Sequence, residues 1–499
     1  MTQFTRKRIR KRPPRQPMSP TLKHHLLVGV GAVVSLIIVY YVGLQVIQQL
    51  SGSRLIAFFS GLFGQELVAD ENDHTNVLLL GIGGEGHSGE DLTDTIIVAS
   101  IDQKTKWVSM LSIPRDLYVS SSMGQSRVNK LYEYGKAKWD SQIGLDFTRD
   151  TISEVLDIPI HYVAKVDFAA FEKVVDSVGG IDIYVEHAIN DPFYPLDGTY
   201  DYAPFSIAKG MNHLDGKTAL KYVRSRKTSS DFDRSERQQQ ALIALRDKAN
   251  EYGKLSKARF IRDLYYSLSD HVQTDLSIRE IISFADFAAS WDSAKRNSAT
   301  IHDDPSQKGG FLYTPDRSLY GGAFVLIPAG GLDQLRTYAR FVLYEDKGEA
   351  GDSIAILNGT KIPGFAGSAR AVIQRYGIHV EETANAREQD LTATRWYVLN
   401  PTGEELLPFL TRLIPGEVVR EVPQEYLDDP TLSPLSLILE LGPESKKVLS
   451  EQDVFSGLVS IPQPTSTSST ESESSTAAQE PDDAPASSSS ELDDLPAQQ

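Results

Sequence analysis

Charged side chains gather in the stretch DGKTALKYVRSRKTSSDFDRSERQQQ, residues 215–240. Arg224 and Arg226 precede the polar run KTSS and Arg234 follows it, so three guanidinium groups converge on one loop. Such groups at the start of a helix are good ligands for an oxyanion, and we expect a phosphate or diphosphate rather than a carboxylate. The alternative is a solvated charged helix held by ion pairs. The convergence of the arginines favours the anion site.

Two helices are expected to position these arginines. TALKYVRSR has the apolar spacing of a short amphipathic helix, and RSERQQQALIALRDKANEY that of a second one. Asp231 or Asp233 is placed to cap the second helix at its N-terminus. Gln238 follows Arg234 by four residues, so both side chains share a face.

Further polar residues flank three predicted strands, NVLLL, TIIVASI and WVSMLSI. Asp94 directly precedes the second strand and is a candidate Mg²⁺ ligand through one carboxylate oxygen, with strand capping as an equal alternative. Arg115 follows the third strand, where ligand sites of α/β folds tend to lie. The run RVNK then adds Arg127, Asn129 and Lys130.

The loop GIGGEG after the first strand matches the glycine spacing of a dinucleotide-binding motif. That motif requires a helix to begin there, whereas this loop runs on into another strand, so we reject it. The glycines are better explained by a tight turn or by close approach of the backbone to a ligand.

Composition excludes several classes of protein. The chain has 499 residues, no cysteine and a net charge of −17, so disulfides, thiolate metal sites and cysteine nucleophiles are absent. Residues 1–25 carry eight basic residues and no acid, while residues 463–499 carry eight acids and no base. The body between them therefore holds the whole negative charge, which weighs against binding to nucleic acid.

The two ends of the chain are predicted to lie outside the folded part. Residues 1–25 form a basic tail, and the uncharged residues 26–47 are long enough to cross a bilayer. A cleaved signal peptide is the closest alternative to an anchor. Basic residues on its N-terminal side predict a cytoplasmic N-terminus. Residues 48–75 would form a membrane-proximal spacer, and 463–499 a disordered acidic, serine-rich tail.

The remaining chain divides into two predicted domains. Residues 76–347 alternate strand and helix patterns, which predicts an α/β (mixed α+β) domain with a central sheet flanked by helices. Within it, 262–291 is expected to be helical. The aromatic segment 186–205 is a candidate to contact a ligand, although an ordered surface loop is the simpler account. Residues 353–442 predict a small α/β domain.

With these pieces assembled, the chain resembles the LytR-CpsA-Psr (LCP) family of cell-wall phosphotransferases. The resemblance rests on motifs that follow one another over residues 76–245: NVLLLG, DTIIVASID, SIPRDLYV, RVNKLYEYG, VDSVGGIDIYV, and DGKTALKYVRSR followed by DFDRSERQQQ. Residues 353–442, with LNGT, PGFAG and LILELG, resemble the LytR C-terminal domain.

The resemblance implies an extracytoplasmic enzyme anchored by one helix. It would bind a polyprenyl diphosphate-linked glycan, transfer the glycan phosphate to a peptidoglycan sugar hydroxyl and release polyprenyl phosphate. By resemblance, the diphosphate is held by arginines, namely Arg115, Arg224, Arg226 and Arg234. Asp231 and Gln238 match the acid and amide around the last of these, Arg127 stands where lysine is usual, and Asn129 is a substrate-binding candidate. Asp94 matches one of two metal-binding aspartates, which implies Mg²⁺.

Two positions depart from the family pattern. Gly83 aligns with the second aspartate, and Leu92 stands where an arginine is usual two places before the metal ligand. Four nearby residues are candidates to replace the lost ligand, and the sequence does not choose between them: Glu85, His87, Glu90 and Asp91.

The expected mechanism is attack of the acceptor hydroxyl on the phosphorus that bears the sugar, with the arginines and Mg²⁺ neutralising the diphosphate. Asp231 is a candidate general base, and Asp94 competes for that role. The prenyl chain needs an apolar tunnel, for which helices in 255–290 are a candidate, although core packing explains their apolar residues equally well. A non-catalytic wall-binding scaffold and a lipid diphosphatase are the alternative functions. A membrane-bound transcription regulator is the weakest.

Overall fold

The computed structural model describes residues 66–195, 201–225, 231–251, 262–345 without 293–294, and 353–455. The predicted tails, the predicted anchor at 26–47 and most of the spacer lie outside these residues. Within the described residues, no helix has the length and apolarity needed to span a bilayer.

A six-stranded mixed sheet is the centre of the larger part of the chain. Its strand order is β11-β6-β1-β2-β3-β12. β1 pairs antiparallel with β2 and parallel with β6, while β12 pairs parallel with β3. The strands are β1 (His74–Ile82), β2 (Thr93–Asp102), β3 (Val108–Ser112), β6 (Tyr162–Asp167), β11 (Val272–Thr274) and β12 (Arg296–Thr300).

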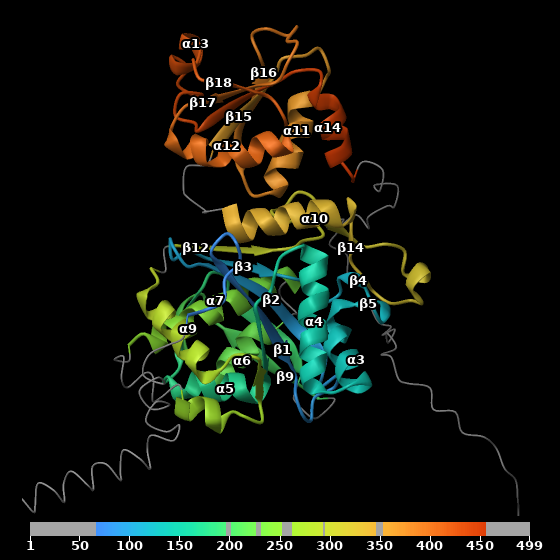
Figure 1. The fold of residues 1–499 in the computed structure, drawn as a ribbon, viewed down its shortest axis with the longest axis vertical. Helices are drawn as coiled ribbons and strands as arrows, with labels where there is room; N and C mark the ends of the chain where they lie inside the picture. The colour runs from blue at the N-terminus through green and yellow to red at the C-terminus, as the bar shows by residue number, and fades with distance from the viewer. Residues whose placement is uncertain are drawn as a thin grey trace, which may run out of the picture. The chain divides into compact units, whose positions relative to one another are not determined.

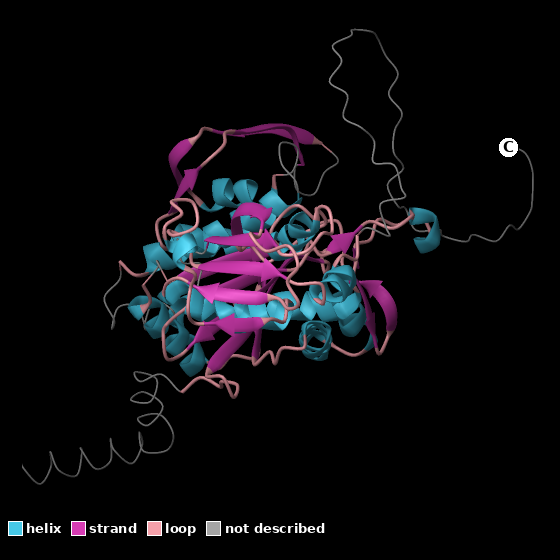
Figure 2. Ribbon diagram, turned by 90° about the horizontal axis from the view of Figure 1, so that it is seen from above, coloured by secondary structure: helices cyan, strands magenta, loops and turns pink. Residues whose placement is uncertain are grey.

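Side chains on successive strand residues point to opposite faces of the sheet, and each face is covered by its own helices. Leu78, Leu80 and Val98 belong to the core cluster that also contains Leu145 and Ile152 of α4 (Ser141–Leu156). Figure 1 shows α3 (Leu131–Lys138) and α4 on one side of the strands, and α5 (Phe168–Ser177), α6 (Gly216–Arg224), α7 (Asp231–Ala249) and α9 (Ile278–Ser290) on the other. Figure 2 shows strands side by side, with helices on both sides of them.

Smaller elements surround this sheet. Two-stranded sheets form from β4 (Tyr118–Ser121) with β5 (Gly124–Arg127), β7 (Ile181–Val185) with β10 (Gly210–Leu214), and β8 (Ile189–Pro195) with β9 (Tyr202–Ile207). The remaining elements are η1 (Val128–Lys130), β13 (Leu312–Tyr313), η2 (Arg317–Tyr320), β14 (Ile327–Pro328), α10 (Gly331–Arg340) and η3 (Phe341–Glu345).

The C-terminal part has its own five-stranded sheet, ordered β16-β15-β19-β17-β18. Its strands are β15 (Ser353–Asn358), β16 (His379–Asn385), β17 (Arg395–Val398), β18 (Glu417–Val419) and β19 (Leu437–Leu441). Its helices are α11 (Phe365–Arg375), α12 (Pro401–Leu413), α13 (Gln424–Leu427) and α14 (Ser445–Gln452). α14 begins beyond residue 442, so it extends this part past the predicted end of the small domain.

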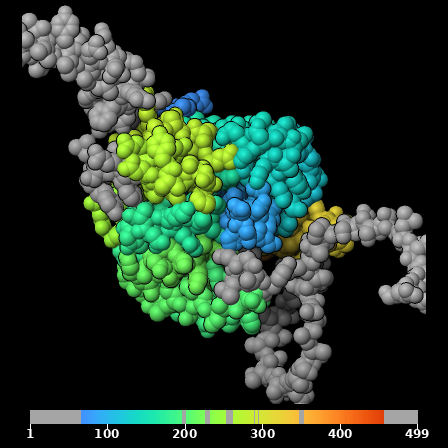
Figure 3. Space-filling view, turned by 90° about the horizontal axis from the view of Figure 1, so that it is seen from below, coloured from blue at the N-terminus to red at the C-terminus, as the bar shows by residue number. Residues whose placement is uncertain are grey.

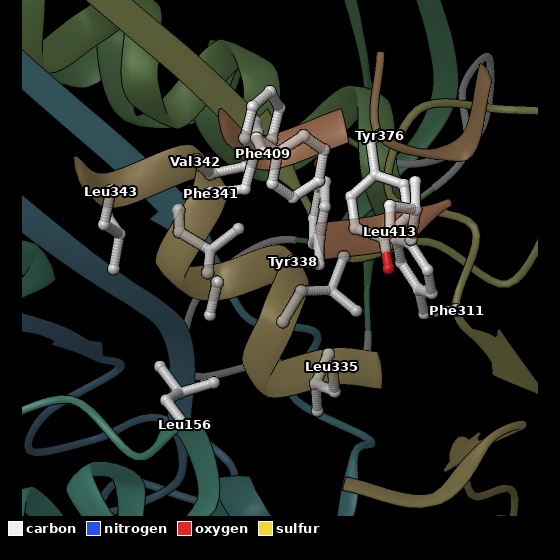
Figure 4. Close-up of a cluster of buried hydrophobic side chains, with 14 of the residues drawn as sticks. Leu156, Phe311, Leu335, Tyr338, Phe341, Val342, Leu343, Tyr376, Phe409 and Leu413 are labelled. Carbon is white, nitrogen blue, oxygen red and sulfur yellow. The ribbon is translucent and has the colours of Figure 1, made fainter. Parts of the chain in front are cut away.

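Aromatic side chains from both parts of the chain pack in one buried cluster (Figure 4). Phe341 of η3 stacks on Phe409 of α12 with ring centroids 4.0 Å apart. Tyr376, which follows α11, contacts Phe311 at 5.0 Å and Phe409 at 5.1 Å. Burial of these rings joins the two sheets through a shared apolar core.

The predicted class, a mixed α/β fold with a central sheet flanked by helices, is confirmed. The prediction of continuous helix over 262–291 is wrong, because β11 interrupts it and pairs antiparallel with β6. Neither Asp231 nor Asp233 is the residue that precedes the second arginine-bearing helix as its N-cap, since α7 already begins at Asp231. The aromatic segment 186–205 contains the hairpin strands β8 and β9 rather than a simple loop. The domain boundaries stay predictions.

Candidate functional site

The sheet register brings residues from five strand ends to one edge. Ile82 at the end of β1 pairs with Thr93 at the start of β2, and Ile97 pairs with Ser112 at the end of β3. Thr300 at the end of β12 also pairs with Ser112, and Asp167 at the end of β6 pairs with Ile82. Residues just beyond these ends, including Gly83, Arg115 and Asp303, therefore overhang the same edge.

Asp94 and Arg115 form the centre of the site. Arg115 Nη1 donates to Asp94 Oδ1 at 2.8 Å, and Arg234 Nη2 lies 3.4 Å from the Asp94 carbonyl oxygen. Arg234 is buried in the second turn of α7, and Gln238 lies one helical turn further on. Helix α7 therefore brings its arginine to the backbone of Asp94 at the start of β2.

A third guanidinium group is held by aromatic rings. The Arg224 guanidinium carbon lies 4.2 Å from the centroid of the Phe168 ring and 5.6 Å from that of Tyr194. Arg224 is the last residue of α6, a helix that begins after the N-cap Asp215. The attraction between the cation and the two aromatic rings holds the guanidinium group in place.

A cavity of about 610 Å³ opens at these charged groups. Asp94, Arg115, Arg224, Arg234 and Gln238 all line it. Most of its other walls are apolar and come from the sheet face opposite α4 and from α5, α6 and α7, with Leu79, Ile97, Val166, Phe171, Val174, Leu220, Val223, Leu242 and Leu245 among them. The site therefore joins a cationic end to an apolar chamber.

Short side chains on the sheet explain why this chamber is not filled. Gly81, Thr95 and Ala164 all line it on the strands β1, β2 and β6. A Cβ atom added at Gly81 would lie 2.9 Å from Thr95 Cβ, so this position admits no larger side chain without a shift. Phe193 and Tyr202 of the β8–β9 hairpin also line the chamber, although 56% and 62% of their surfaces are exposed to solvent. They mark where it opens to the outside.

A second, smaller cavity of about 220 Å³ lies next to the first. Asp94, Arg115, Arg234 and Gln238 line both cavities, so these four residues separate them. Asp116, Ser235 and Asp303 add polar groups to the second cavity, and its apolar walls include Phe232 and Phe324.

Further ion pairs and hydrogen bonds hold the arginine-bearing segments in place. Asp116 Oδ1 accepts from Arg127 at 3.0 Å, and its Oδ2 lies 3.4 Å from Arg115 Nε. Arg237 Nη2 donates to the carbonyl oxygen of Ser225 at 2.6 Å, and Ser225 Oγ donates to Asp191 at 2.8 Å. Burial lowers the pKa of Arg237. Arg237 and Asp191 thus fix the end of α6 against α7 and β8.

A model of the LytR_cpsA_psr family matches residues 51–319, more than half of the chain. The chain belongs to the LytR-CpsA-Psr family. Residues 353–438 match a second model, described as LytR cell envelope-related transcriptional attenuator.

Curated relatives are similar over the larger part of the chain. The polyisoprenyl-teichoic acid–peptidoglycan teichoic acid transferase TagT of Bacillus subtilis (strain 168) is 32% identical over 236 residues, 46% of this chain and 69% of TagT. TagU of Oceanobacillus iheyensis, with the same enzyme description, is 34% identical over 42% of this chain and 62% of its own length. The matches thus span about two thirds of these relatives.

Solved LCP structures are also similar. The crystal structure of B. subtilis TagV is 27% identical, with a TM-score of 0.42, and the match covers 55% of this chain and 98% of TagV. A structure described as the LytR-CPS2A-psr family protein YwtF (TagT) with bound octaprenyl pyrophosphate lipid is 25% identical, with a TM-score of 0.38. That match covers 56% of this chain and 93% of the other.

Five of the LCP site residues predicted from the sequence line the large cavity together: Asp94, Arg115, Arg224, Arg234 and Gln238. Arg127 and Asn129 line neither cavity. Arg127 instead reaches the site through Asp116, and the backbone N–H of buried Asn129 donates to the Arg115 carbonyl at 3.2 Å. Arg226 and the side chain of Asp231 lie outside the described residues, although Asp231 is the first residue of α7.

The structure distinguishes between the four candidates for the ligand lost at Gly83. His87 lines the large cavity beside Gly83, and a Cβ atom added at Gly83 would lie 2.8 Å from His87 Cβ. Asp91 is paired with Lys136 at 2.5 Å, and neither Glu85 nor Glu90 lines either of the two cavities described above. The imidazole of His87 therefore fills the space beside Gly83.

Among the described residues, Asp94 is the carboxylate that suits a Mg²⁺ ion at the site. No group of three or more His, Asp or Glu side chains in this part of the chain is arranged to hold a metal. Mg²⁺ often binds through one or two carboxylates together with substrate phosphates. Asp94, at the cationic end of the cavity, suits such an ion shared with a bound phosphate group, rather than an ion held by protein alone.

Several residues of the site were not singled out as ligands from the sequence. Phe168 and Tyr194 hold Arg224, but a lone aromatic residue in a sequence gives no sign of such stacking. The apolar chamber is formed by β1, β2, β6 and α5 to α7, whereas no described residue of 255–290 lines it. Asp303 lies outside the family motifs, and only the parallel pairing of β12 with β3 places it at the site.

Proposed function

We propose that this protein is a phosphotransferase that moves a glycan phosphate from a polyprenyl diphosphate carrier to a sugar hydroxyl of peptidoglycan. The observation that carries the proposal is the joining of three arginines to an apolar chamber of about 610 Å³. A diphosphate needs the cationic end, and a prenyl chain needs the apolar walls. Membership of the LCP family and the transferase names of the curated relatives support the same reaction.

In this proposal the arginines do most of the work on the donor. Arg115, Arg224 and Arg234 bind and orient the diphosphate and neutralise charge on its oxygens in the transition state. A Mg²⁺ ion on Asp94 would supply further positive charge to the same oxygens. Phosphoryl transfer depends mainly on positioning and charge, so no protein nucleophile is required.

The location of the reaction is also proposed. A prenyl-linked donor stays with a membrane, so we place the folded part at the outer surface of the cell membrane with residues 26–47 as its anchor. Phe193 and Tyr202, exposed at the opening of the chamber, would then lie where the lipid enters.

The test is turnover of a polyprenyl diphosphate-linked sugar by the full-length protein in detergent. We expect release of polyprenyl phosphate only when a peptidoglycan acceptor is present, with more release in Mg²⁺ than in chelator. Arg115→Ala and Arg224→Ala should each lower donor affinity by roughly 10–150-fold, because a hydrogen bond to a charged group contributes about 1.5–3 kcal/mol. Arg420→Ala, which removes an exposed pair with Glu404, is the matched control.

Other outcomes would identify the alternatives. Release without acceptor indicates a diphosphatase. Tight donor binding without release, in conditions where TagT is active, indicates a binding scaffold. Arg226→Ala extends the test to the predicted arginine that lies outside the described residues.

A further inference from the structure

The second cavity and the apolar chamber use alternate residues of β2, since Ile96 lines the second cavity whereas Thr95 and Ile97 line the chamber. Successive strand residues point to opposite faces, so the two spaces lie on opposite sides of this strand end. Asp94, Arg115, Arg234 and Gln238 line both spaces. Under the proposed function, on which this inference rests, the diphosphate lies at these four residues and its prenyl end extends into the large chamber. The side facing the second cavity is then the side away from the leaving group.

The direction from which the nucleophile attacks gives a role to the side that faces the second cavity. In phosphoryl transfer the attacking and leaving oxygens lie roughly in line with the phosphorus. A leaving group directed into the large chamber requires the nucleophile to approach from the other side. The volume of about 220 Å³ and a lining that combines polar groups with Phe232 and Phe324 suit a single sugar ring.

Three carboxylates from the described residues line the second cavity, and one of them differs from the other two. Asp94 accepts from Arg115 at 2.8 Å, and Asp116 accepts from Arg127 at 3.0 Å. In both carboxylates an oxygen is therefore already engaged by a guanidinium group. Asp303 Oδ1 lies 3.7 Å from Nδ1 of the adjacent His302, and this nitrogen accepts from the backbone N–H of Asp304 at 3.0 Å. His302 is itself stacked on Phe232 with ring centroids 3.7 Å apart.

The surroundings of Asp303 suit proton transfer. Burial raises its pKa, whereas His302 opposes that change. Burial also lowers the pKa of His302, which favours the neutral ring. A carboxyl group whose pKa is raised toward the working pH is a better general base than an ordinary aspartate.

We propose that the second cavity binds the acceptor sugar and that Asp303 is the general base for its hydroxyl group. The hydroxyl oxygen forms a bond to the sugar-bearing phosphorus while its proton passes to an Asp303 oxygen. The bond from that phosphorus to the bridging oxygen breaks, and polyprenyl phosphate leaves with the electron pair. Asp303 then loses the proton to solvent.

Three substitutions test the base and the two cavities independently. Asp303→Asn keeps the size of the side chain and removes the base. Ser235→Leu adds bulk to the second cavity only, and Val174→Phe adds bulk to the large chamber only. Asp304→Asn is the matched control, since Asp304 caps the turn at Ser306 and lines neither cavity.

Asp303→Asn should lower transfer by about 100–10,000-fold, as general base catalysis contributes about that much. Its affinity for geranylgeranyl diphosphate, measured by calorimetry, should equal that of wild type. The wild-type transfer rate should fall as the pH drops through the pKa of Asp303. The residual transfer rate of Asp303→Asn should not show this fall. Ser235→Leu should lose binding of a soluble peptidoglycan disaccharide but keep the lipid, and Val174→Phe should do the reverse.

Equal transfer rates for wild type and Asp303→Asn would overturn the assignment of the base. Disaccharide binding that is unchanged in Ser235→Leu would overturn the acceptor site. If wild type binds lipid and transfers nothing, the proposed function fails. The disaccharide titrations then still decide whether the second cavity binds sugar.

Discussion

Arg115 links the two carboxylates of the site, because its guanidinium group contacts both Asp94 and Asp116. A planar group with several N–H donors can hold these oxygens and still direct donors toward a diphosphate. Lysine carries the same charge on a single nitrogen and cannot reproduce this geometry. Arg115 therefore matters for the shape of its side chain as well as for its charge.

Arg115→Lys should weaken binding of geranylgeranyl diphosphate by roughly 10-fold or more, although the net charge is unchanged. The dissociation constant is measured by calorimetry at constant ionic strength. Arg420→Lys provides the control for the same exchange at an exposed pair. Equal affinities for Arg115→Lys and wild type would mean that charge alone holds the diphosphate.

His161 gives the protein a pH-dependent stability. Burial lowers its pKa below 6.5, although Asp70 opposes the change. The folded state therefore prefers the neutral ring of His161. The contribution of this preference to the stability of the fold is complete above pH 6.5 and is lost as the pH falls below 6.5. His161→Gln should show a smaller drop in melting temperature between about pH 7.5 and about pH 5. An unchanged drop, matching that of the exposed-site control His379→Gln, would contradict this role.

Individual elements show how local sequence ends a helix. α4 begins after Asp140, whose side chain accepts from the backbone N–H of Ile143, and ends at Asp157. Asp157 adopts a left-handed conformation with φ of 54°. Glycine is the usual residue at such a position, because an L side chain is strained there.

Asp157→Gly should raise the free energy of unfolding by up to about 1 kcal/mol, since it removes this strain. The same exchange inside the helix, Asp150→Gly, should lower it by about 1 kcal/mol. Urea titrations followed by circular dichroism measure both. Destabilisation by both substitutions would show that the Asp157 side chain contributes more than its backbone strain costs.

The stacked pair Phe341 and Phe409 makes the two parts of the folded chain interdependent. Removing one ring leaves a cavity in the core that both sheets share. Phe409→Ala should therefore cost about 3–5 kcal/mol. In calorimetry, wild type should unfold in one transition, and the variant should unfold at lower temperature. Leu427→Ala, at an exposed site, is the control. Two separate wild-type transitions would show that the shared core does not couple the parts.

The sequence predicted elements best where the local pattern was strong. The apolar runs of β1, β2 and β3 indicated strands, and the arginine motifs identified side chains that do meet at one cavity. β11 and β12 lack such runs, since VQT and RNSAT are mainly polar, and only pairing with β6 and β3 makes them strands. The chamber escaped prediction because it depends on short residues from three strands facing the same helices.

The space-filling view shows residues near the start of the described chain (blue) between the cyan α3–α4 segment and the green α5–α6 segment (Figure 3). Contacts at the site thus join residues far apart in the chain. Local pattern alone identifies such residues but does not show which of them meet.

The order of the strands has a consequence for synthesis. β3 ends at Ser112, but its outer neighbour β12 begins only at Arg296. At about 5–20 residues per second, the ribosome needs roughly 10–40 s to make the residues between them. During that time the edge of β3 has no partner strand, and an unpaired edge favours association between chains. Slow completion of the sheet, rather than weakness of the finished fold, is therefore the stage at which this protein is most exposed to aggregation.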